Sequence, residues 1–138
     1  MIIDSHCHLD YEPMFSNLEE VIKRAKDSNV KFMLTISVND NKYDTILNII
    51  NKFNNVYGTY GIHPHEAKNH NEINKDTILK RVKISKKIIG IGETGLDFYY
   101  NHSDKNQQIK LFEEHIKAYI ESNLPLIVHS RDAEDLTY

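Results

Sequence analysis

The sequence predicts a parallel α/β fold, in which short strands alternate with helices. Apolar and β-branched runs recur along the 138 residues, and stretches with apolar residues at helical spacing separate them. Most clusters of His, Glu, Asp and Arg follow the strands, whereas the turns after the helices are short and plain. This asymmetry is typical of parallel α/β proteins, which carry their sites at the carboxyl ends of the strands. We expect residues 1–138 to form a single domain with about four and a half βα units.

Five strands are predicted from runs rich in apolar and β-branched residues. The run FMLTISV at residues 32–38 is almost continuously apolar, which suits a strand that is buried on both faces. The run IIGIGE at residues 88–93 contains two glycines that keep the strand slim, and the loop TGLDFYY is expected to begin directly after it. The other strands are predicted at residues 2–6, 56–62 and 124–129.

Helices are predicted between these strands from apolar residues spaced three or four positions apart. The first, at residues 16–29, begins with Ser16 and has Glu19 three residues later, which is the pattern of a capping box. The longest, at residues 104–122, is expected to end before Asn123. The remaining helices are predicted at 41–53 and 77–85, and another begins in the last segment, SRDAEDLTY.

The composition excludes several classes of protein. The formal net charge is -3, so any binding to nucleic acid has to be local rather than driven by overall charge. The single cysteine, Cys7, cannot form an intrachain disulfide and suits a reducing compartment. No apolar run reaches the roughly 18 residues of a membrane span, and the first residues suggest a strand rather than a secretion signal. We therefore expect a cytoplasmic protein that does not enter a membrane.

The strongest candidate site consists of His6, His8, Glu93 and His129, which stand at the ends of three predicted strands. Side chains alternate along a strand, so His6 and His8 project from one face, about 7 Å apart, and can bind one ion. A carboxylate such as Glu93 can join two hard cations about 3.5–4 Å apart or act as a general base. The structural alternatives are histidines bonded to backbone carbonyls and an ion pair between Glu93 and a histidine.

Four further residues follow the same strands and complete the candidate site. Asp97 is expected to support the site by orienting a ligand histidine rather than to bind metal itself. In the segment His63-Pro64-His65, we expect His63 to contact a substrate phosphate or the transition state and His65 to be structural. Arg131 either binds phosphate through two of its N–H groups or pairs with a nearby acidic residue, Asp132 or Glu134.

The chain has eight histidines, and three of them lie outside these motifs. His70, His102 and His115 lie in polar loops or on a helix, and we expect them on the surface.

Four motifs in order, DSHCHLD, GIHPH, GIGETGLD and PLIVHSRDA, resemble the TatD family of metal-dependent hydrolases over the whole chain. The resemblance implies an incomplete TIM (β/α)8 barrel. It also implies that His6 and His8 hold one divalent ion, His129 holds a second, and Glu93 bridges the two. Mg²⁺ is the expected metal, with Zn²⁺ or Mn²⁺ as alternatives. The implied activity is hydrolysis of DNA phosphodiester bonds by a metal-activated water, with 3′ to 5′ exonuclease action. Glu93 and His63 would be the catalytic residues, and Arg131 and His63 would bind the DNA.

The chain departs from the family in length. A (β/α)8 barrel needs about 250 residues, whereas this sequence stops inside the fifth unit. A further His and an Asp of the family, the latter commonly taken as the catalytic base, have no counterpart here. Two alternative hypotheses are another amidohydrolase-type phosphoesterase or amidase, and a truncated, inactive metal-binding fragment. Because a half-barrel leaves two open sheet edges, we also expect low stability as a monomer and self-association.

Overall fold

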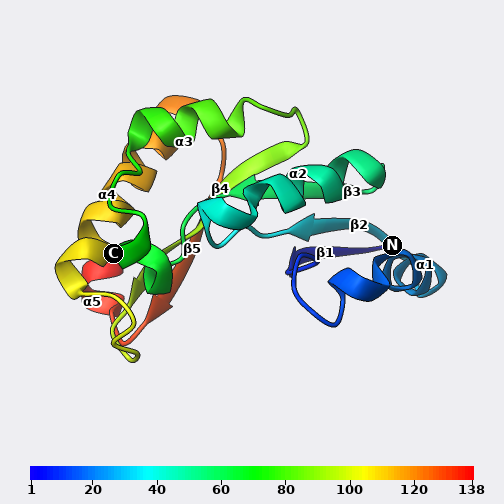
Figure 1. Cartoon of the computed structure of the whole chain (residues 1–138), viewed down its shortest axis with the longest axis horizontal. Coiled ribbons are helices and arrows are strands. Elements are labelled where there is room, and N and C mark those ends of the chain that lie inside the picture. The colour runs from blue at the N-terminus through cyan, green and yellow to red at the C-terminus, as the bar shows by residue number, and fades with distance from the viewer.

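The computed structural model describes all residues, 1–138, and contains one curved sheet of five strands in the order β1-β2-β3-β4-β5 (Figure 1). Every neighbouring pair of strands is parallel. The prediction of a parallel α/β fold is therefore confirmed. Because the sheet curls only part of the way round, β1 and β5 remain as open edges. The strands are β1 (Ile2–Cys7), β2 (Val30–Thr35), β3 (Val56–Tyr60), β4 (Ile88–Asp97) and β5 (Leu126–Arg131).

Helices lie along the outside of the curved sheet (Figure 1). No helix combines the length and the hydrophobicity that a membrane span requires. The first helix begins two residues later than predicted because residues 15–17 form a 3-10 turn instead. The helices are α1 (Leu18–Asp27), α2 (Tyr43–Lys52), α3 (Lys75–Val82), α4 (Lys105–Ser122) and α5 (Glu134–Thr137), and the 3-10 turns are η1 (Phe15–Asn17), η2 (Asp40–Lys42) and η3 (Pro64–Asn69).

The main hydrophobic core lies between the sheet and the helices and contains 19 buried residues. Ile46 of α2, Ile78 of α3 and Ile91 of β4 are fully buried in it. Burial of a side chain of this size contributes roughly 1.5–3 kcal/mol to folding. The two edge strands differ from the central strands, since Ile3 of β1 is 57% exposed and Val128 of β5 is 44% exposed. The fold therefore leaves apolar surface open at both edges of the sheet.

The main departure from the predicted elements is the end of β4. Residues 94–97 were predicted as a loop, but they continue the strand to Asp97 and pair with β5, from Thr94 opposite Val128 to Asp97 opposite Arg131. Gly95 makes this pairing possible because it has a φ of 137° and its Cα lies against the backbone of His129, where no side chain would fit. Gly95, which lay in the predicted loop, in fact permits close contact between two strands. Glu93 and Asp97 consequently lie on one strand.

Candidate metal centre

Backbone hydrogen bonds at the carboxyl ends of the strands position the candidate ligands. The His63 N–H donates to the Val38 carbonyl oxygen at 2.8 Å. The Glu93 N–H donates to the Ser37 carbonyl oxygen at 2.9 Å. Both acceptors lie in the segment that follows β2. The segment after β2 thus holds His63 and Glu93 close to each other, because each of them donates a backbone hydrogen bond to it.

A first cluster of ligand atoms consists of His6, His8 and Glu93, whose nitrogen and oxygen atoms lie within 4.8 Å of one another. Nε2 of His6 is 3.5 Å from Oε2 of Glu93. The Nδ1–H of His8 donates a hydrogen bond to the carbonyl oxygen of Ile36 at 3.1 Å. A neutral imidazole that donates through Nδ1 keeps the lone pair on Nε2, which is the state that binds a metal ion.

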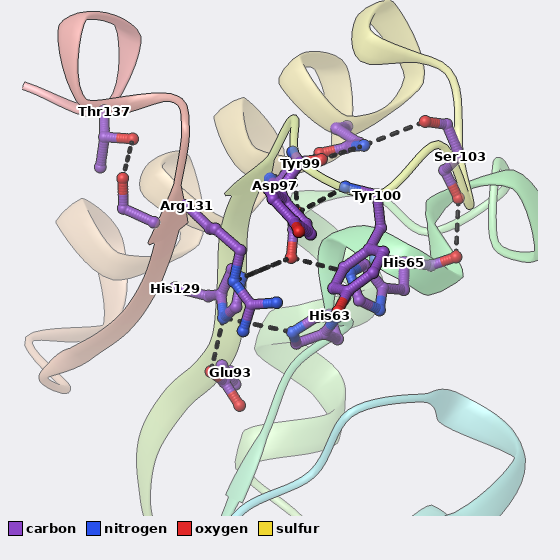
Figure 2. A network of polar contacts seen from close by, with 12 residues as sticks. His63, His65, Glu93, Asp97, Tyr99, Tyr100, Ser103, His129, Arg131 and Thr137 are labelled. Atoms are coloured by element: carbon purple, nitrogen blue, oxygen red, sulfur yellow. Dashed lines mark hydrogen bonds and ion pairs between the residues drawn. The ribbon is translucent and has the colours of Figure 1, made fainter.

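A second cluster consists of His63, Glu93 and His129, again with ligand atoms within 4.8 Å of one another (Figure 2). Nδ1 of His129 is 3.2 Å from Oε1 of Glu93. Glu93 thus belongs to both clusters and directs one carboxylate oxygen to each. This is the arrangement by which a carboxylate can bridge two divalent ions.

Asp97 supports the second cluster through a hydrogen bond to His129. Its Oδ2 accepts from Nε2 of His129 at 2.9 Å and from Nε2 of His65 at 2.8 Å (Figure 2). Its Oδ1 accepts from the N–H groups of Tyr99 and Tyr100. Burial by itself raises the pKa of this carboxyl, but the hydrogen bonds from Tyr100 and the two histidines outweigh it and lower the pKa to about 2. Asp97 is therefore ionised and holds both imidazoles in fixed orientations.

The proton on Nε2 of His129 has a consequence for the opposite side of its ring. Because Nε2 donates to Asp97, Nδ1 carries the lone pair. That lone pair faces Oε1 of Glu93, another acceptor, at 3.2 Å. Two acceptors this close together, with only the Nε2–H of His63 directed at Nδ1, can be joined by a shared cation. The donor set of imidazoles and a carboxylate suits Zn²⁺, Mn²⁺ or Mg²⁺, so the residues present fit a divalent ion.

His63 differs from the other histidines in its hydrogen bonds. Its Nδ1 accepts from the N–H of His65 at 3.2 Å, so its Nε2 carries the proton and donates to Nδ1 of His129 at 3.3 Å. Burial and the neighbouring His129 and His65 rings lower the pKa of His63 to about 3, which keeps the ring neutral. His63 therefore presents an N–H donor to the cluster in this structure, although its position also suits a ligand.

The side chain of Arg131 lies beside this network rather than against the acidic residues next to it. Its Nε is 3.8 Å from Oδ2 of Asp97, and its guanidinium lies over the ring of Tyr100 at 5.3 Å. The alternative of a salt bridge to Asp132 or Glu134 was wrong, because the pairing of β5 with β4 turns Arg131 toward Asp97.

Two histidines that were expected on the surface are in fact buried. His70 is 3% exposed and His115 is completely buried, whereas His102 is exposed as expected. In α4, Nδ1 of His115 donates to the carbonyl oxygen of Leu111 at 2.8 Å, and Nε2 accepts from the Ile62 N–H at 3.1 Å. Burial lowers the pKa of His115 to about 4. The prediction failed because the helix packs this face against the segment that leads into His63.

The sequence also gave no indication of a hollow beside the two clusters. It has a volume of about 480 Å³ and takes in residues of the β1–α1 loop that no motif had marked, Tyr11 and Met14. Glu66 of η3 is likewise part of its lining. These residues are brought to the site by the course of the loops, which short patterns in the sequence do not specify.

Comparison with known proteins identifies the family. The family model described as TatD related DNase matches residues 3–138. An uncharacterized metal-dependent hydrolase of Buchnera aphidicola is 37% identical over 144 residues, which is 99% of this chain and 54% of that protein. The 3′-5′ ssDNA/RNA exonuclease TatD of Salmonella typhimurium is 28% identical over 117 residues, which is 85% of this chain and 45% of that protein.

Solved structures agree with this assignment. The TatD homologue YjjV of Escherichia coli has a TM-score of 0.83 at 26% identity, with 99% of this chain and 53% of that chain covered. A TatD family hydrolase of Entamoeba histolytica, at 24% identity, shares the fold with a TM-score of 0.85 over 99% of this chain and 52% of that chain. The fold is thus the expected part of a TIM barrel, and the chain spans about half the length of the curated relatives that it matches. The chain belongs to the family of TatD-related DNases and corresponds to the amino-terminal part of its relatives.

Proposed function

We propose that this chain carries the metal-binding part of a hydrolase that cleaves DNA phosphodiester bonds with a metal-activated water. The observation that carries the proposal is Glu93, which directs one carboxylate oxygen to each of two histidine clusters. Two hard cations joined by a carboxylate are typical of enzymes that act on phosphate esters. Membership of the TatD family supports a hydrolase, and the exonuclease TatD of Salmonella typhimurium supports DNA as the substrate.

The residues divide into three roles in this proposal. His6, His8 and Glu93 would hold one divalent ion, and Glu93 and His129 would hold the other, with Mg²⁺ expected and Mn²⁺ or Zn²⁺ as alternatives. When bound, such ions lower the pKa of a water and neutralise charge on a phosphoryl oxygen.

The remaining residues act on the substrate or through the ligands. The Nε2–H of His63, which donates to His129 in this structure, would donate a hydrogen bond to a phosphate oxygen, and its ring stays neutral. Arg131 is exposed enough to reach a phosphate while it stays beside Asp97. Asp97 acts through His129, whose ring it orients so that Nδ1 faces Glu93.

Calorimetric titration of the 138-residue chain with Mn²⁺ tests the site directly. We expect two binding events in the wild type and the loss of both in Glu93→Gln, because that residue belongs to both clusters. Glu66→Gln is the matched control, since Glu66 lines the same hollow but belongs to neither cluster. Absence of metal binding in the wild type, or equal binding by the Glu93 variant, would show that the site is wrongly assigned.

The reaction is tested with a labelled single-stranded oligonucleotide and with phosphatase and amidase substrates, each in Mg²⁺, Mn²⁺ and Zn²⁺. Cleavage of the oligonucleotide that is lost in Glu93→Gln would support the nuclease. Activity on the other substrates alone would favour another amidohydrolase-type reaction. Metal binding without turnover of any substrate would favour an inactive metal-binding fragment.

A further inference from the structure

The hollow beside the metal centre has two chemically different parts. Part of its lining consists of Glu93 and of the imidazoles of His8 and His63, which belong to the two clusters. The rest of its lining is formed largely by Tyr11, Met14 and Val38. Its volume of about 480 Å³ lies within the roughly 300–1,000 Å³ that is typical of small-molecule sites. An apolar and aromatic surface directly beside a candidate phosphate-cleaving centre calls for a substrate with an apolar, planar part.

Tyr11 joins this surface to the metal centre. Its ring stands edge-on to His8, with centroids 5.7 Å apart, and it is 39% exposed, so ring surface remains open. Lys42 of η2 places its ammonium 4.0 Å from the centroid of the same ring. Lys42 forms no salt bridge, and its charge acts on the carboxyl of Asp10, whose pKa burial raises and Lys42 partly lowers again. One side chain thus contacts a candidate ligand, His8, and a lysine ammonium, that of Lys42, at the same time.

We propose that Tyr11 and Lys42 form a nucleotide subsite, an inference that rests on the proposed function. The base next to the cleaved phosphate stacks on Tyr11 and contacts Met14, and Lys42 pairs with the next phosphate along the strand. Stacking on aromatic side chains and contact of phosphates with lysines are the usual means of holding a single strand.

The subsite accepts a single strand and not a duplex. In a duplex each base is stacked between its neighbours, so neither of its faces can reach Tyr11 without being extruded. The carboxylate of Glu66 disfavours a second phosphate beside it, which leaves that part of the hollow for the uncharged base. The ammonium of Lys42 lies over one face of the Tyr11 ring, so the base stacks on the other face.

The role of Tyr11 is tested by calorimetry with two probes in saturating Mn²⁺, thymidine 5′-monophosphate and 2-deoxyribose 5-phosphate, which lacks the base. We expect the nucleotide to bind roughly 5- to 150-fold more tightly, which corresponds to the usual strength of base stacking. Tyr11→Phe keeps the ring and should keep this ratio. Tyr11→Leu should lower the ratio to near one without changing the affinity for the sugar phosphate. Tyr119→Leu is the matched control, since Tyr119 is 43% exposed and lies on α4.

The role of Lys42 is tested with the dinucleotide pdTpdT, which carries a second phosphate. Lys42→Met should remove the gain in affinity over the mononucleotide and make binding less sensitive to salt. Lys105→Met is the control, because the Lys105 ammonium lies over the Phe98 ring at a similar distance, 4.4 Å, away from the hollow.

The outcomes separate this inference from the proposed function, because Mn²⁺ binding is measured first and without either probe. Normal metal binding with equal affinity for the two probes, or with no binding of either, would overturn the subsite and leave the metal centre intact. Absence of metal binding would contradict the proposed function itself. A base preference that survives Tyr11→Leu would show that the stacking surface lies elsewhere.

Discussion

Because the imidazole of His115 is buried, we expect the stability of this protein to fall at mildly acidic pH. Its Nδ1–H donates to Leu111, and its Nε2 accepts from the Ile62 N–H. Protonation would give the ring a second N–H group, at Nε2, and this group would point directly at the N–H of Ile62. The ring is also completely buried, and burial disfavours its charged form. Acidification is therefore expected to weaken the contact between α4 and the segment that leads into His63.

The magnitude follows from the two pKa values of His115. The pKa is about 4 in the folded protein and 6.5 in an unfolded chain. Between these values the unfolded state binds a proton that the folded state does not, so the free energy of unfolding falls as the pH falls. Each pH unit in this range removes up to about 1.4 kcal/mol, or about 3 kcal/mol in all. This is a large part of the roughly 5–15 kcal/mol that stabilises a typical domain.

Urea denaturation followed by circular dichroism at pH 7, 6, 5 and 4.5 measures this effect. His115→Leu cannot titrate, so its stability should fall less steeply over this range, although it is lower at pH 7 by about 1–3 kcal/mol because the Ile62 N–H loses its partner. His102→Gln is the matched control, since His102 is exposed. If the wild type and His115→Leu lose stability in parallel between pH 6.5 and 4.5, then the assignment of this imidazole as a neutral, buried group is wrong.

Three further outcomes are expected. Asp97→Asn should weaken Mn²⁺ binding about 10- to 100-fold in calorimetry, because the ring of His129 is no longer held, whereas Asp132→Asn should bind normally. Tyr60→Phe should lower the free energy of unfolding, measured in urea, by about 1–2 kcal/mol, because the Tyr60 hydroxyl donates to Asp40 at 2.8 Å and Asp40 also pairs with Arg81. Tyr57→Phe is the control, and an equal loss in both variants would argue against a stabilising role of the Tyr60 hydroxyl. The open strand edges should cause self-association in analytical ultracentrifugation, which Ile3→Lys on β1 should reduce; a monomer that melts cooperatively would contradict this expectation.

The sequence predicted the candidate ligands better than the elements that carry them. Four candidate ligands were expected at the carboxyl ends of parallel strands: His6, His8, Glu93 and His129. The structure brings their ligand atoms together there in two clusters. Their roles as metal ligands stay a prediction. Strand alternation was sufficient for this step, because the carboxyl ends of parallel strands necessarily meet.

The errors have a common origin in contacts between distant segments. Gly95 lay in a predicted loop, but it allows β4 to lie directly against the backbone of β5. His115 was expected on a helix surface, but that part of α4 accepts a hydrogen bond from Ile62, 53 positions away in the sequence. Tyr11 belonged to no recognised motif, and only the path of its loop brings it to His8. In each case the local pattern was compatible with two environments.

By itself, the sequence determined the order of strands and helices, the parallel fold and the set of side chains at the strand ends. These features follow from spacings of two and of three to four residues, which are local properties of a chain. Only the tertiary structure decided which oxygen of Glu93 faces which histidines, which nitrogen of His129 is free, and which loop lines the hollow. Those features depend on the curvature of the sheet and on hydrogen bonds between residues far apart in the sequence, and no short pattern of residues encodes them.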